Sequence, residues 1–228
     1  MTLPILYSEE FVAGYVGNLR QFLSLRSNAA TIIELHHRSG PDGSKKRSVI
    51  NLLAAASGKS AEDVVAQHTL APLSRAFAID DVDCKHGADR NQTRLRVHGA
   101  RFSSAYPQYC PLCAVEDKDF WGLSYWRRYH LICGIDHCLK HQETALISVS
   151  TQRPFTYSPD YHYSKLQSVG QDNGSPGKFF VDPFVRRYAE ICAGLLETKL
   201  PIGRLSMAAA VRNRMTCLVS NKLCLRIF

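Results

Sequence analysis

Residues 110–141 read CPLCAVEDKDFWGLSYWRRYHLICGIDHCLKH and carry a pair of metal-ligand residues at each end. The first pair is Cys110 and Cys113, and the second is Cys138 and His141. Because two intervening residues let one tight turn supply two corners of a tetrahedron, two such pairs can complete the coordination shell of Zn²⁺. Four protein ligands leave no position for water or substrate, so the pattern predicts a structural rather than a catalytic zinc site.

Other cysteines and histidines leave alternatives open. Cys133 and His137 lie close enough in sequence to replace one of these ligands, whereas His130 is expected to be a neutral core histidine. A set of reduced, buried cysteines without a metal is the second alternative. The cysteines without a paired neighbour are expected to be small apolar core residues; they are Cys84, Cys133, Cys192, Cys217 and Cys224.

Composition describes an ordinary globular chain with a basic surplus. The 228 residues are 45% hydrophobic and 21% charged, with a net charge of +8 and a pI near 9.1. Met1–Ser8 has no leader pattern, and no run approaches membrane-spanning length, so we expect a cytoplasmic protein without a membrane partner. A polyanion such as DNA fits the charge.

Arginines gather before the first ligand pair and after Glu197, where no acidic residue follows. These runs predict either a solvated face or a nucleic-acid surface. The candidate contact residues in them are Arg94, Arg96, Arg101, Arg204, Arg212 and Arg214.

The first 80 residues predict a helical region. From Ser8, a plausible N-cap, to about Arg38, apolar residues recur at helical spacing. Val49–Ala56 then reads as a short helix, Gly58 as the residue that ends it, and Ser60 as the cap of a helix running to about His68.

This second pair of helices resembles a helix-turn-helix, with Ala61–Gln67 in the position that would enter the major groove. An ordinary helical hairpin is favoured slightly, because Glu62 and Asp63 would repel phosphate. The sequence therefore predicts a mainly α protein with a small zinc-ribbon insertion and a helix-turn-helix-like N-terminal region.

The chain divides by composition into four parts. Residues 1–80 are the helical region, 81–150 the zinc-binding region, 151–178 a linker rich in Tyr, Ser, Pro and Gly, and 179–228 a C-terminal helical region. In the last part Pro183 is expected to open a helix that ends near Glu197, with Phe184, Tyr188, Ile191 and Leu195 on its apolar face. A short helix is expected at Ser206–Val211, and the ending suggests a truncated form of a longer protein.

The combined motif resembles the TniQ family, in particular its TnsD-like members. The resemblance rests on Cys110–Cys113, the aromatic and basic segment Tyr125–His130, and Cys138–His141. Tyr7–Glu10 and Gln67–Leu73 also resemble family positions, so the likeness spans roughly the first 150 residues.

The resemblance implies a non-catalytic adaptor that selects the DNA target of a bacterial transposon and recruits its AAA+ ATPase regulator. Some relatives recognise an attachment sequence directly. Others act as dimers carried by an RNA-guided CRISPR effector complex. The implied partners are therefore DNA, the ATPase and, in the second mode, the effector with its guide RNA and a second copy of the chain.

The residues between the ligand pairs have two interpretations. Trp121, Tyr125 and Trp126 are expected to pack over the metal site or to project as anchors for a partner. Arg127 and Arg128 are expected to contact phosphate or an acidic partner.

Three other classes compete with the adaptor. A small zinc-stabilised HNH-like nuclease would need His36, His37, His130 or His137 as a base beside a second, open metal site, and no Asn lies between suitable histidines near the two ligand pairs. A cysteine protease built on Cys133 would take nucleophile and base from one segment, which is unusual. A zinc-stabilised transcription factor could read DNA through the N-terminal helices.

Overall fold

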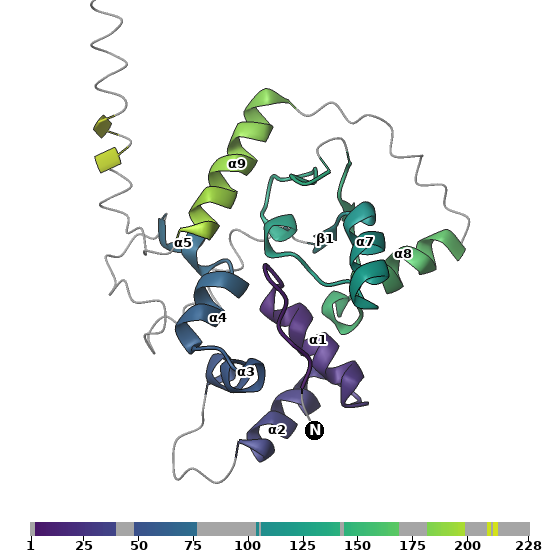
Figure 1. The fold of residues 1–228 in the computed structure, drawn as a ribbon. Coiled ribbons are helices and arrows are strands. Elements are labelled where there is room, and N and C mark those ends of the chain that lie inside the picture. Colours follow the sequence, from purple (N-terminus) through teal and green to yellow (C-terminus); the bar gives the residue numbers. More distant parts are fainter. Residues whose placement is uncertain are drawn as a thin grey trace, which may run out of the picture.

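The computed structural model describes residues 3–39, 48–76, 104, 106–141, 144–168, 182–198, 209, 210, 212 and 213. It confirms a mainly helical protein (Figure 1). The elements are α1 (Val12–Phe22), α2 (Asn28–Arg38), α3 (Val49–Ser57), α4 (Ala61–His68), α5 (Ala71–Ala76), β1 (Gln108–Tyr109), α7 (Pro111–Trp121), the 3₁₀ turn η1 (Arg128–Leu131), β2 (Ile147–Ser148), the 3₁₀ turn η2 (Pro154–Thr156), α8 (Pro159–Ser168) and α9 (Pro183–Glu197). Among these described residues, no helix has the length and apolar character needed to cross a membrane.

The predicted helical segment from Ser8 to Arg38 is two helices rather than one. A turn with Ser24 at a φ of 52° separates α1 from α2, and the side chain of Ser27 accepts a hydrogen bond from the backbone N–H of Ala30 to cap α2. Ser8 is not a cap. The backbone turns at Glu9, which has a φ of 63°, and α1 begins only after Phe11.

The predicted helix, turn and helix over residues 49–68 is confirmed. Gly58 ends α3 in the left-handed region at a φ of 68°, and the Ser60 hydroxyl accepts a hydrogen bond from the N–H of Asp63 at 3.0 Å to start α4. Helices α1–α4 share one apolar core, whose largest buried members include Tyr15, Leu19 and Leu53.

The metal-ligand region begins and ends in a short antiparallel ribbon. Gln108 pairs with Ser148 and Tyr109 with Ile147, so β1 and β2 bring the two ends of the region together. Between β1 and β2 the chain forms α7, the segment around η1 and the loop that carries the second ligand pair. Helix α7 lies beside α8 (Figure 1).

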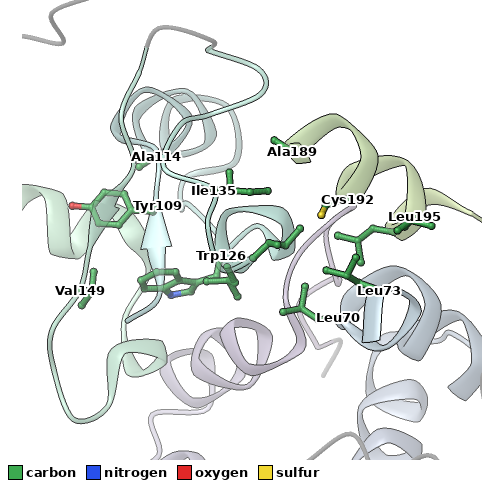
Figure 2. Close-up of a cluster of buried hydrophobic side chains, with 13 residues drawn as sticks. Leu70, Leu73, Tyr109, Ala114, Trp126, Ile135, Val149, Ala189, Cys192 and Leu195 are labelled. Carbon is green, nitrogen blue, oxygen red and sulfur yellow. The ribbon is translucent and has the colours of Figure 1, made fainter. Parts of the chain in front are cut away.

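A second core joins the ribbon region to the C-terminal helix around the buried indole of Trp126 (Figure 2). Gly14 of α1 lies against this indole, since a Cβ at that position would be 2.9 Å from Trp126 Cδ1. The cluster collects side chains from the ribbon, from the end of α4 through α5 and from α9; those labelled in Figure 2 are Leu70, Leu73, Tyr109, Ala114, Trp126, Ile135, Val149, Ala189, Cys192 and Leu195.

Two expectations for the C-terminal half need correction. The predicted linker contains η2 and α8, which pack against α1 and α7, so part of it is ordered by tertiary contacts. Helix α9 has the predicted start and end, and its predicted face is right in part: Leu195 is buried and Tyr188 packs against the core. Phe184 and Ile191 are exposed instead, while Ala189 and Cys192 are buried. The predicted helix at Ser206–Val211 lies largely outside the described residues.

Candidate metal centre

The N-terminus of α7 positions the first ligand pair. Cys110 is the N-cap residue, Pro111 occupies the first helical turn, and Cys113 follows on the same turn. Both thiol side chains are buried. The unpaired N–H groups and the dipole at a helix N-terminus favour negative charge, so this position favours thiolates.

The second ligand pair lies on a tight loop after η1. Gly134 adopts a φ of 83° and turns the chain toward Cys138. The backbone N–H of His141 lies 3.4 Å from Cys138 Sγ, and that of Cys138 donates to the carbonyl oxygen of Thr144 at 3.0 Å. These bonds shape the loop so that Cys138 and His141 face the same point.

The four side chains form one cluster, with their ligand atoms within 4.8 Å of one another. The Sγ atoms of Cys113 and Cys138 are 3.7 Å apart, and His141 Nδ1 lies 3.5, 3.3 and 3.7 Å from the sulfurs of Cys110, Cys113 and Cys138. With Zn–S near 2.3 Å and Zn–N near 2.0–2.1 Å, a tetrahedron has S···S edges of about 3.8 Å and S···N edges of about 3.5 Å. The residues therefore fit a tetrahedral metal ion of this size.

Without a bound cation, three thiols this close together do not all ionise readily, because their negative charges repel one another. The pKa of Cys138 is lowered mainly by its hydrogen bond with Cys110 and secondly by that with Cys113. The pKa of Cys113 is raised by hydrogen bonding to Cys110 and by burial. One thiolate is thus favoured at the expense of another. A bound dication would remove this conflict because thiolates are its ligands.

Glu116 of α7 fixes the imidazole of His141. Its Oε1 lies 3.0 Å from His141 Nε2, which leaves Nδ1 to face the sulfurs. Its Oε2 accepts a hydrogen bond from Lys140 Nζ, and this bond, together with the His141 contact, lowers the pKa of Glu116. A carboxylate on the distal nitrogen of a ligand histidine sets its tautomer and raises its basicity. The sequence interpretation did not identify Glu116 as part of the site. Its position one helical turn after Cys113, on the side of α7 that faces the second ligand pair, is the feature that could have indicated it.

The alternative ligands lie outside this cluster. Within the described part of the chain, the cluster contains neither Cys133 nor His137. Cys133 is exposed, contrary to the expected core position, whereas Cys192 is buried as expected. His130 is buried as predicted, and burial lowers its pKa and keeps the ring neutral.

The two central arginines face the interior. Arg128 is 1% exposed and pairs through Nε and Nη2 with the carboxylate of Glu9 at 2.7 and 3.1 Å. The Arg127 guanidinium pairs with Asp117 Oδ1 at 2.6 Å and lies 4.5 Å from the ring centre of Tyr125. The expectation that both contact phosphate or a partner is therefore corrected for Arg128, and Arg127 is already engaged within the chain.

The three candidate aromatic anchors divide between core and surface. Trp126 is part of the core and donates its indole N–H to the carbonyl oxygen of Tyr157, while Tyr125 is buried and stacks on Tyr7 at 5.0 Å. Trp121 remains 46% exposed at the end of α7. Of the three, only Trp121 keeps a surface that a partner could contact.

Most of the predicted basic contacts lie outside the described residues: Arg94, Arg96, Arg101, Arg204 and Arg214. Arg212 is described and exposed. The structure thus brings the metal ligands together and leaves the arginine runs as predictions.

The sequence model of the family described as TniQ matches residues 3–144, which include all four metal-ligand residues. No curated protein matches the chain.

Proposed function

This chain belongs to the TniQ family, and from that membership we propose that it is a non-catalytic, zinc-binding adaptor that selects the DNA target of a bacterial transposon and recruits an AAA+ ATPase regulator. Membership supports a role in transposition target selection. The match over residues 3–144 is the observation that carries the proposal. The adaptor acts in the cytoplasm, at the nucleoid, where the target DNA lies.

The metal of the proposal is Zn²⁺, held by Cys110, Cys113, Cys138 and His141. The tetrahedral spacing of the four ligand atoms supports this choice, as does the closed set of three sulfurs and one nitrogen. When bound, the ion supplies a cross-link between α7 and the loop after η1. The role is structural because four protein ligands leave no position for a substrate.

DNA reaches this adaptor in one of two ways. Direct reading would use the α3–α4 helical hairpin and the arginine runs, in keeping with the net charge of +8. RNA-guided targeting would instead place a dimer of the chain on a CRISPR effector complex. The acidic first turn of α4, with Glu62 and Asp63, disfavours close approach of that turn to phosphate.

A capture experiment distinguishes these modes. The tagged chain, with its metal content measured, is offered the AAA+ regulator and, separately, an effector complex from the same host. We expect capture of the ATPase in both modes and capture of the effector only in the RNA-guided mode. Failure to capture either partner by metal-loaded protein would contradict the adaptor function, as would metal-dependent cleavage of DNA by the chain.

A transcription factor is the second candidate because α3, the Gly58 turn and α4 resemble a helix-turn-helix in the order of helix, tight turn and helix. This class predicts sequence-specific duplex binding without the ATPase. Exposed Gln67 of α4 provides the test, since its replacement by Ala would reduce binding to a selected duplex if α4 reads bases. Unchanged binding would count against this class.

A further inference from the structure

A pocket of about 480 Å³ opens beside the segment that leaves β2. Its walls come from this segment, from η2 and from α8, and they include Val149, Arg153, Tyr157, Tyr161, Lys165 and Leu166. None of these residues is a metal ligand. The volume falls within the range of small-ligand sites in proteins.

Two tyrosines form an aromatic wall of this pocket, which we call the tyrosine pocket. The rings of Tyr157 and Tyr161 stack with centroids 4.2 Å apart and an angle of 19° between their planes. Arg20 of α1 lies 5.3 Å from the ring centre of Tyr157. Tyr161 remains 43% exposed although one of its faces is stacked on Tyr157, so aromatic surface remains for a ligand.

The charge of the tyrosine pocket is positive. Arg153 and Lys165 line it, and neither forms an ion pair with any residue that the structure describes. The nearest acidic residue on α8, Asp160, accepts hydrogen bonds from the hydroxyl and the N–H of Ser124 and lies 3.7 Å from Lys118 Nζ. The Asp160 carboxylate is therefore paired on the side of α8 that faces α7. Arg153 and Lys165 remain available to an anion in the pocket.

The backbone of the tyrosine pocket is held by the rest of the fold. Trp126 Nε1 donates to the carbonyl oxygen of Tyr157 at 2.9 Å, and Arg20 Nη2 donates to that of Thr156 at 3.0 Å. The ring of His162, at Nε2, lies 3.0 Å from the carbonyl oxygen of Pro154 and ties α8 to η2. A site held in this way needs little ordering when a ligand binds, which favours affinity.

We propose that the tyrosine pocket binds one nucleotide of a single-stranded nucleic acid. The base stacks on Tyr161, and the adjoining phosphate lies between Arg153 and Lys165. Aromatic platforms beside cations are how proteins hold unpaired strands, because every base offers a π-face and every nucleotide a negative charge. The inference rests on the proposed function for the presence of nucleic acid, and it assigns the contact to η2 and α8 instead of the α3–α4 hairpin.

The test measures binding of the full metal-loaded chain to a labelled single-stranded DNA, a single-stranded RNA and a duplex of the same sequence. Tyr161→Ala and Lys165→Glu should each weaken binding of a single strand by about fivefold or more, because one stacked base or one phosphate contact is lost. Matched controls outside the pocket are Tyr106→Ala, which removes an exposed tyrosine ring, and Arg26→Glu, which reverses an exposed positive charge; both should leave affinity within about twofold. The DNA and RNA arms show which strand is preferred.

Single-strand affinity that is unchanged in both pocket variants, or reduced equally in the controls, would overturn the inference. A wild-type chain that binds only the duplex would overturn it as well. Neither result bears on the proposed adaptor function, which is tested by capture of the ATPase. If the chain fails to capture the ATPase but still binds a single strand through the pocket, the adaptor function is overturned and the nucleotide-binding inference stands.

Discussion

Arg128 shows how one buried side chain joins segments that are distant in sequence. Besides its pair with Glu9, its guanidinium donates to the carbonyl oxygens of Ala66 at the end of α4 and of Leu196 at the end of α9. These carbonyls are among the last of their helices and have no partner within the helix. Arg128 therefore completes two helix ends and the N-terminal turn together.

Replacement of Arg128 by Met should lower the free energy of unfolding by about 3 kcal/mol, since buried carbonyls and a carboxylate lose their donor while volume is kept. Urea unfolding measures the change. The control is Arg38→Ala, which removes only the surface pair with Glu34 and should cost less than about 0.5 kcal/mol. Equal losses in the two variants would contradict the role of Arg128.

Glu116→Gln should weaken metal binding by about tenfold to a hundredfold, because the amide no longer provides a charged acceptor for His141 Nε2. Competition with a chelator measures the affinity. Asp119→Asn removes a charge from an exposed position of the same helix and serves as the control. If both variants release the metal alike, Glu116 acts only through its charge.

Glu10 should make folding stability depend on pH. It is 0% exposed, and burial raises its pKa to about 8, although the N–H of Tyr7 and the amide of Asn18 donate to it. The native carboxyl keeps its proton up to about pH 8, whereas the carboxyl of the unfolded chain releases it near pH 4.5. The contribution of Glu10 to folding stability is therefore fully present below pH 4.5 and is lost as the pH rises through 8.

The difference in unfolding free energy between wild type and Glu10→Gln isolates this effect. It should change by on the order of 3 kcal/mol between about pH 5 and about pH 8, in favour of the variant at the higher pH. Glu62→Gln, at an exposed position, should show no such trend. A flat difference for Glu10→Gln would show that the native carboxyl is ionised throughout.

At the scale of elements, the turn between α3 and α4 depends on glycine. Gly58 adopts a φ of 68°, and a Cβ there would meet nothing within 4 Å, so substitution introduces backbone strain but no clash. Gly58→Ala should therefore lower stability by about 1 kcal/mol. Gly194→Ala within α9, also without neighbours within 4 Å, should raise stability by up to about 1 kcal/mol. Thermal melts of the two variants should shift in opposite directions, and a shared direction would contradict this account.

Helix α8 illustrates how an element can form where composition predicts a linker. Its sequence is polar and offers no strong apolar face, and its buried side chains include Pro159 and His162. The contacts that hold it come from elsewhere: Asp160 accepts from Ser124, and the helix packs on α7. These partners are distant in sequence, so local pattern gives little sign of the helix.

In the whole molecule, the three cysteines of the candidate metal site and the N-terminal helices belong to separate clusters of buried residues. Cys110→Ser, or removal of the metal by a chelator, should therefore unfold the region around β1, α7 and the second ligand pair while α1–α4 keep their structure. Hydrogen exchange would show loss of protection there and retention in α1–α4.

Cys133→Ser is the matched control for this experiment, because Cys133 is exposed and lies outside the ligand cluster. It should keep the metal and the exchange pattern of the wild type. Full protection in the metal-free chain would show that the ribbon and the core around Trp126 suffice to hold the region.

Features that depend on near neighbours in the chain could be predicted from the sequence. The four clustered ligands, the helical hairpin with Gly58 and Ser60, and the limits of α9 all follow from spacing, capping and backbone preference within a few residues. Each is a local property of the chain, so it can be predicted before anything is known of the tertiary contacts.

Which side chains are buried and which surfaces stay exposed depends instead on long-range contacts. Arg128 reads as a surface cation from sequence, and its interior position follows from Glu9 and two helix ends that arrive from distant segments. The apolar face of α9 and the tyrosine pocket depend likewise on what packs beside them. Such contacts form between residues far apart in the chain, where spacing and propensity carry no information about which partners meet.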